Sequence, residues 1–167
     1  MTHTETEQAG RKWYSASWPP LAWLETGIKL VAIVVGLVAL IQALSSGQFG
    51  LPDGLCLAQW VVLLLLSLGL LAAIVDRIIQ REIVAMVFVI LNNLGHWGMV
   101  ISLASVPGPG VLLPLFAGLM LAGDLVKLVF MKVHDFKVRN TPRSVLFGLT
   151  TAYAVGYLII LLLSLMS

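Results

Sequence analysis

The chain has 167 residues, of which 59% are hydrophobic and 11% are charged, and its formal net charge is +2. This composition lies far outside the range of soluble globular domains. No basic patch alternates with aromatic residues, so we expect no nucleic-acid partner. The single cysteine, Cys56, excludes an intrachain disulfide and a CxxC redox pair.

The first 25 residues are polar and then aromatic, and they precede the first apolar run. Four aromatic residues, Trp13, Tyr14, Trp18 and Trp23, are typical of a segment that lies at the lipid headgroups. The apolar run begins too late and is too long for a cleaved signal peptide. We therefore predict a cytoplasmic or interfacial segment at 1–25 and a transmembrane domain at 26–167.

Five apolar runs make up most of the remaining chain. They lie at 27–45, 57–75, 83–104, 111–131 and 145–166. Each is close to the roughly 20 residues that a helix needs to cross the hydrocarbon core of a bilayer. The sequence predicts an all-α integral membrane protein, a single bundle of five transmembrane helices surrounded by the lipid bilayer of the cell membrane.

The connections between the runs alternate in charge. All ten Lys and Arg residues precede the first run, follow the second or fourth run, or lie in the adjoining ends of the runs. The loops 46–56 and 105–110 and the C-terminal residues contain none. The positive-inside rule then predicts a cytoplasmic N-terminus and a C-terminus outside.

The third run contains the segment LNNLGHWG, which is polar at the depth of the membrane centre. Polar side chains at that depth usually face a partner or a water-filled cavity. Asn92 and His96 are four residues apart and share a helix face, whereas Asn93 points elsewhere. We expect Gly95 and Gly98 to let another helix or a ligand come close. For His96, a hydrogen bond in the core and a functional role both remain open.

The fourth run contains Asp124, whose side chain is too short to reach the interface, and Lys127, which is long enough. Their i, i+3 spacing allows an ion pair on one helix face. Alternatively, Asp124 binds a proton or a ligand. Glu25, just before the first run, and Lys29, within it, form either an interfacial ion pair in water or part of a vestibule that leads to Asp124.

The fifth run contains two patterns. Tyr153 and Tyr157 are four residues apart and form either one wall of a pocket or ordinary packing. Gly148, Ala152 and Gly156 form a stripe of small residues, typical of close helix contacts. That stripe serves packing within the chain or the interface of a homo-oligomer.

No GxSxG, HExxH, Walker or GxGxxG element occurs, so we expect no cofactor or metal, and the sequence favours a protein that is not an enzyme without excluding one. The first of three remaining functions is a small transporter, channel or ligand-binding bundle, linked to proton movement, whose polar pocket contains Asn92, Asn93, His96, Asp124 and Lys127. The second is a non-catalytic accessory or assembly subunit of a membrane complex, and the third a membrane-embedded enzyme. A water-accessible cavity at Asp124 would favour the first, and full pairing of Asp124 in a dry core the second.

Overall fold

The structure is a computed structural model that describes residues 18–133 and 142–166; the predicted interfacial aromatics Trp13 and Tyr14 lie outside these residues. The described residues form five α-helices and no strand: α2 (Pro20–Ser46), α3 (Gly54–Gln80), α4 (Ile83–Leu103), α5 (Leu112–Val133) and α6 (Arg143–Ser164). All five are long and apolar enough to cross a membrane. The predicted all-helical bundle of five such helices is confirmed at this level.

Two of the helices extend further than the apolar runs predict. Helix α2 begins at Pro20, inside the segment predicted at 1–25, because proline suits the first position of a helix. Helix α3 continues through Asp76 and Arg77 and ends only where Arg81 adopts a left-handed backbone conformation. Backbone hydrogen bonding does not depend on side-chain polarity, so charged residues lie on helices here and not in loops.

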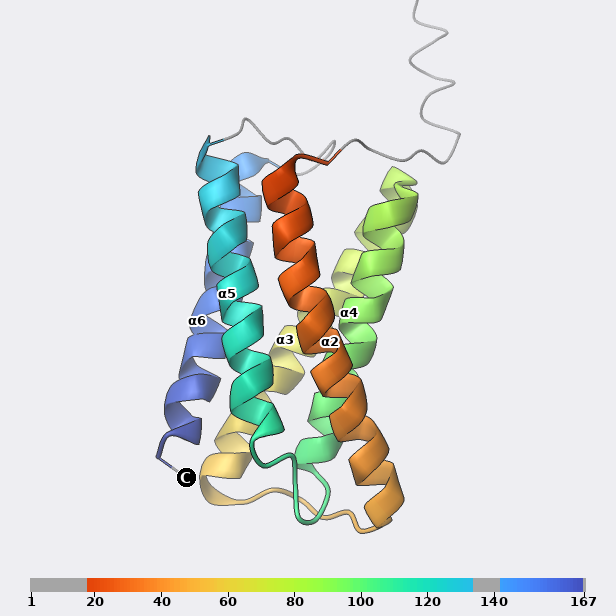
Figure 1. Cartoon of the computed structure of the whole chain (residues 1–167), viewed down its shortest axis with the longest axis vertical. Coiled ribbons are helices and arrows are strands. Elements are labelled where there is room, and N and C mark those ends of the chain that lie inside the picture. Colours follow the sequence, from red (N-terminus) through yellow and green to blue (C-terminus); the bar gives the residue numbers. More distant parts are fainter. Residues whose placement is uncertain (1–17, 134–141, 167) are drawn as a thin grey trace, which may run out of the picture.

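The helices form a ring. Helix α2 packs on α4 and α5, α3 packs on α4 and α6, and α5 packs on α6, so the order around the ring is α2–α4–α3–α6–α5 (Figure 1). We call the end where α2 and α6 begin the basic end, and its described cations are Arg77, Arg81, Lys132 and Arg143. The opposite end is called the distal end.

The distal half of the ring is tightly packed. A Cβ atom on Gly36 of α2 would collide with the carbonyl oxygen of Gly95 on α4, and one on Gly98 would lie 2.5 Å from the Gly36 carbonyl oxygen. The expectation that Gly95 and Gly98 admit another helix is therefore confirmed, and that helix is α2. The main hydrophobic core continues from this contact through Met99, Phe116, Met120 and Ile160.

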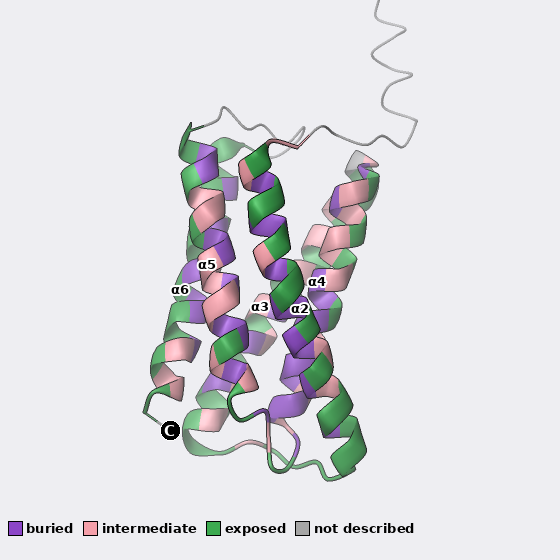
Figure 2. Ribbon diagram, in the orientation of Figure 1, coloured by how far each residue is buried: buried purple, intermediate pink, exposed green. Residues whose placement is uncertain are grey.

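The distal loops are joined by backbone hydrogen bonds. The amide of Gly50 donates to the carbonyl oxygen of Ala104 at 2.9 Å, and the amide of Val106 donates to that of Gln48 at 3.0 Å. Exposed residues follow the outer faces of the helices (Figure 2), and many are large and apolar. Such a surface is typical of a protein that contacts lipid.

Candidate functional site

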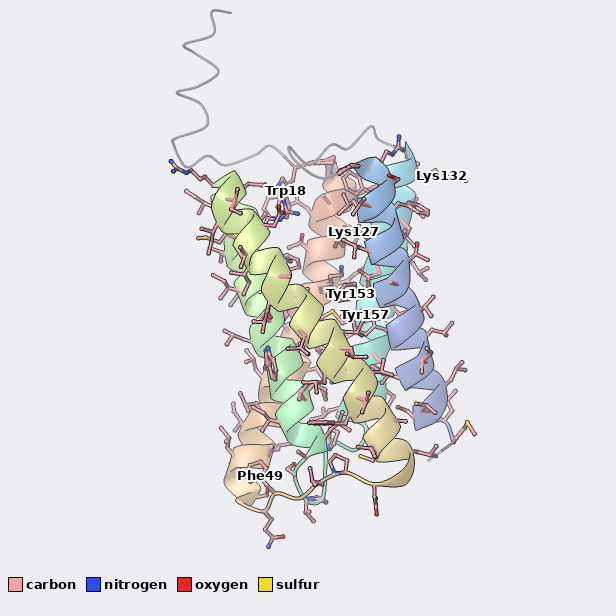
Figure 3. The ribbon with its side chains drawn as sticks, turned by 180° about the vertical axis from the view of Figure 1, so that it is seen from behind. Trp18, Phe49, Lys127, Lys132, Tyr153 and Tyr157 are labelled. Atoms are coloured by element: carbon pink, nitrogen blue, oxygen red, sulfur yellow. The ribbon has the colours of Figure 1, made fainter. Side chains whose placement is uncertain are left out.

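A cavity of about 480 Å³ lies in the basic half of the ring and is lined by residues of all five helices. This volume is within the range of small-molecule sites. Asn92, Asp124 and Lys127 of the predicted site line it, as do both predicted wall residues, Tyr153 and Tyr157. Figure 3 shows Lys127, Tyr153 and Tyr157 on the interior side of the ring, seen between α3 and α6.

Three charged side chains form a buried triad in the cavity wall. Lys29 Nζ lies 2.8 Å from Glu25 Oε1 and 2.6 Å from Asp124 Oδ1, and all three residues are buried. Glu25 and Lys29 do pair, but inside the bundle and not in water. Asp124 pairs across the α2–α5 contact with Lys29, and the predicted Asp124–Lys127 pair does not form.

Gly123 explains how Lys29 reaches Asp124. A Cβ atom at Gly123 would lie 2.8 Å from Lys29 Cγ and 2.9 Å from Lys29 Cε. The aliphatic part of the lysine therefore runs directly over the backbone of α5, where any larger residue would displace it. In the sequence this contact is marked only by a glycine immediately before the carboxylate, and it was not predicted.

Lys127 is half-buried in the cavity wall, one helical turn from Asp124. Within the described part of the chain, no hydrogen bond or ion pair engages its ammonium group. Since it lies i, i+3 from Asp124, both residues are on the same side of α5. The cavity therefore contains one ion-paired lysine, Lys29, and one lysine without such a partner among the described residues.

Two buried oxygen atoms of cavity-lining residues, Asp124 Oδ2 and Asn92 Oδ1, accept no hydrogen bond from the described residues. Buried acceptors without donors are rare in native proteins, and an unseen water, ion or ligand is the usual explanation. The two side chains come from α5 and α4, on opposite sides of α2. Two residues of the cavity wall, on α5 and α4, therefore each carry an acceptor without a donor among the described residues.

Asn93 is not part of the cavity wall. Its Nδ2 donates to the carbonyl oxygens of Leu70 on α3 and Val89 on α4, both at 3.0 Å. It therefore joins α3 to α4, and the expectation that it points away from Asn92 is confirmed. Its Oδ1 is also buried without a donor.

His96 lies behind the cavity and not in its wall. Its Nδ1 is 2.7 Å from the backbone oxygen of Asn92, which can only accept, so Nδ1 carries the hydrogen. In the neutral ring Nε2 then accepts from the Tyr157 hydroxyl at 2.5 Å. The ring also contacts Phe116 edge-to-face, with centroids 5.1 Å apart. His96 therefore holds Tyr157 in place, and Tyr157 faces the cavity.

A second cluster of cavity-lining residues was not predicted from the sequence. Trp18 Nε1 donates to Glu82 Oε1 at 2.8 Å, and Arg77 Nη1 lies 3.6 Å from Glu82 Oε2. All three residues line the cavity. They connect the segment before α2 to the α3–α4 turn. Trp18 was predicted to be an interfacial residue, and its bond to Glu82 gives it a contact within the chain.

The small-residue stripe of α6 divides into two parts. Gly156 packs on Leu66 of α3, whose side chain would lie 3.0 Å from an added Cβ atom. Gly148 and Ala152 are exposed, and Gly148 faces open space. Packing within the chain therefore uses only the distal end of the stripe.

In the described ranges, no three His, Cys, Asp or Glu residues are arranged to hold a metal ion. Comparisons of the chain with protein-family models, with curated proteins and with solved structures found no match. The function must therefore be inferred from the chemistry of the cavity itself.

Proposed function

We propose that the chain is an integral protein of the cell membrane, with its N-terminus in the cytoplasm and its C-terminus outside. Five long apolar helices with exposed apolar outer faces support insertion. The gathering of the described cations at one end supports the orientation through the positive-inside rule. The cavity would then open toward the cytoplasmic side.

The function that the geometry supports best is the binding of a small ligand in this cavity. The observation that carries the proposal is a cavity of ligand size lined by Asp124 and Asn92, each of which has a buried oxygen atom without a donor among the described residues. A ligand with N–H or O–H groups would satisfy both. Translocation of the ligand, or of a proton, would also require the packed distal core around Phe116 and Met120 to open.

A second candidate is a non-catalytic accessory subunit of a membrane complex. The Glu25–Lys29–Asp124 triad would then serve only to join α2 to α5. The exposed residues Gly148 and Ala152 would contact a second copy or another subunit, because small residues allow close helix approach. This function needs no water in the cavity.

Cysteine accessibility distinguishes the two candidates. In a Cys56→Ser background, Ala73→Cys places a thiol in the cavity wall, and Val75→Cys places one on the exposed outer face of the same helix. Labelling with a membrane-impermeant, charged methanethiosulfonate is measured in inside-out and right-side-out vesicles.

For the ligand-binding function, we expect the thiol at position 73 to react in inside-out vesicles roughly tenfold faster than the thiol at position 75, which lipid shields. Reaction from the cytoplasmic side alone would also support the orientation. Equal, slow reaction at both positions would indicate a dry interior and favour the accessory subunit. Faster reaction in right-side-out vesicles would contradict the orientation.

A further inference from the structure

The ring is open on one side at the basic end. Helices α3 and α6 approach each other at the distal end, where Gln59 Nε2 donates to Ser164 Oγ at 3.1 Å. Nearer the basic end, a further bond between them joins the Tyr153 hydroxyl to the Leu66 carbonyl oxygen at 2.9 Å, and the two helices diverge from there (Figure 3). Gly69, Ala72 and Leu149 line the cavity and are exposed on the outer surface. The cavity therefore communicates with the outer surface through the α3–α6 gap.

The rim of this gap is apolar, whereas the opposite wall is charged. Leu149 is 53% exposed, and the facing residues of α3 are glycine and alanine. In a bilayer, such a gap would face acyl chains and not headgroups, because apolar helix surfaces lie in the hydrocarbon region. A ligand that occupies both environments must have an apolar tail and a polar head.

The charges inside the cavity specify that head. The triad has two carboxylates and one ammonium, so its formal charge is negative, and Asp124 Oδ2 still lacks a donor. One turn along α5, Lys127 has no anionic partner among the described residues. Of the other charged lining residues, Arg77 pairs with Glu82, and Asp76 is also engaged.

We infer that the cavity binds a zwitterionic phospholipid with a primary ammonium group, such as phosphatidylethanolamine, which reaches it sideways through the α3–α6 gap. The ammonium donates an N–H bond to Asp124 Oδ2, and the phosphate meets Lys127. The acyl chains leave between Ala72 and Leu149 into the bilayer. This inference rests on the proposed ligand-binding function and names the ligand class.

Lipid retention by the purified, delipidated full-length chain tests this inference. Native mass spectrometry would compare phosphatidylethanolamine with phosphatidylcholine of identical acyl chains. The choline nitrogen carries three methyl groups and cannot donate a hydrogen bond. We expect phosphatidylethanolamine to bind roughly tenfold more tightly, as one hydrogen bond to a charged group implies. Equal retention of the two lipids would overturn the inference.

Two pairs of variants locate the binding. Asp124→Asn should reduce the preference for phosphatidylethanolamine to near equality, whereas Leu125→Ala, on the exposed face beside it, should leave the preference intact. Leu149→Trp should narrow the gap and weaken binding of both lipids severalfold, and Leu158→Trp, exposed elsewhere on α6, should not. An unchanged preference in Asp124→Asn would overturn the assignment of the headgroup site.

A further variant keeps the test decisive if Asp124→Asn fails to fold. Lys127→Gln should weaken binding of both lipids by a similar factor, because both carry the phosphate. Binding of soluble phosphoethanolamine, with no retention of either lipid, would overturn the inference that the ligand is a membrane lipid. The ligand would then be a free zwitterion. A cavity reached by the thiol reagent at position 73 that retains none of these probes would overturn the inference and leave the proposed function standing.

Discussion

The two halves of this bundle are built from the same five helices but differ in how the space between those helices is filled. In the distal half, Gly36 and Gly95 bring two backbones into contact, and Met99 and Phe116 are completely buried. In the basic half, a cavity of about 480 Å³ separates the helices, and its wall holds the Glu25–Lys29–Asp124 triad.

The difference shows what small residues and charged residues each do in such a ring. Glycines remove side chains and let α2 and α4 touch, so that dispersion contacts hold the distal half together. Buried charged side chains need partners, and one such bond, from Lys29 Nζ to Asp124 Oδ1, joins α2 to α5 in the basic half. His96 and Tyr157 lie where the two kinds of packing meet.

The substitution with the largest expected effect on stability is in the basic half. Lys29→Met removes the only cation of the triad and leaves Glu25 and Asp124 buried together, so we expect unfolding to become easier by about 3 to 5 kcal/mol. Unfolding in mixed detergent micelles measures this. Lys127→Met is the matched control and should cost below about 1 kcal/mol. Equal losses in the two variants would contradict the triad.

A second substitution tests the distal half. Gly36→Ala places a methyl group against the backbone of Gly95, so α2 and α4 must separate, at a cost of about 1 to 3 kcal/mol. Gly27→Ala in the same helix meets no atom within 4 Å and should be neutral or stabilising by up to about 1 kcal/mol. A similar destabilisation in both variants would contradict the α2–α4 contact as its cause, because Gly27 makes no such contact.

Substitutions of the two tyrosines test where the packed half ends and the cavity begins. Tyr157→Phe leaves the buried His96 Nε2 without its partner and should cost about 1 to 3 kcal/mol. Tyr153→Phe removes a bond to the Leu66 carbonyl oxygen beside the cavity, where water can replace it, so the loss should stay near 0.5 kcal/mol. Thermal unfolding of the purified variants measures both, and a larger loss for Tyr153→Phe would argue against a wet cavity.

The smallest effect on folding is expected at the outer surface. Ala152→Leu lies on an exposed face, so the free energy of unfolding of one chain should change by less than about 0.5 kcal/mol. If the chain forms the predicted homo-oligomer through Gly148 and Ala152, the same substitution should weaken its association in sedimentation experiments. A clear loss of chain stability would instead place Ala152 at a contact within the bundle.

The sequence predicted the five helices because each apolar run has the length of a membrane span. It also identified Asn92 and Asp124, since polar residues stand out against apolar surroundings. It could not identify Lys29 as the partner of Asp124, because that pairing depends on α2 lying next to α5. With apolar residues on nearly every helix face, no amphipathic pattern indicates which helices are neighbours.

For the same reason, only one side of each glycine contact could be predicted from the sequence. Gly95 and Gly98 stood out within a polar segment, but Gly36 lies in an ordinary apolar run, and only the three-dimensional contact reveals that the two sites meet. Gly123 is similar, since its role depends on a lysine 94 positions earlier in the chain. The sequence thus gives the parts of the site, and the ring order decides which of them meet.

The most direct test of the central claim is a double-mutant cycle between Lys29→Met and Asp124→Asn, with unfolding free energies measured in mixed micelles. The claim that these residues pair across α2 and α5 predicts a coupling energy of about 2 kcal/mol. A parallel cycle with Lys127→Met and Asp124→Asn should be additive within about 0.5 kcal/mol. Additive losses for Lys29 and Asp124, with strong coupling for Lys127 and Asp124, would contradict the account.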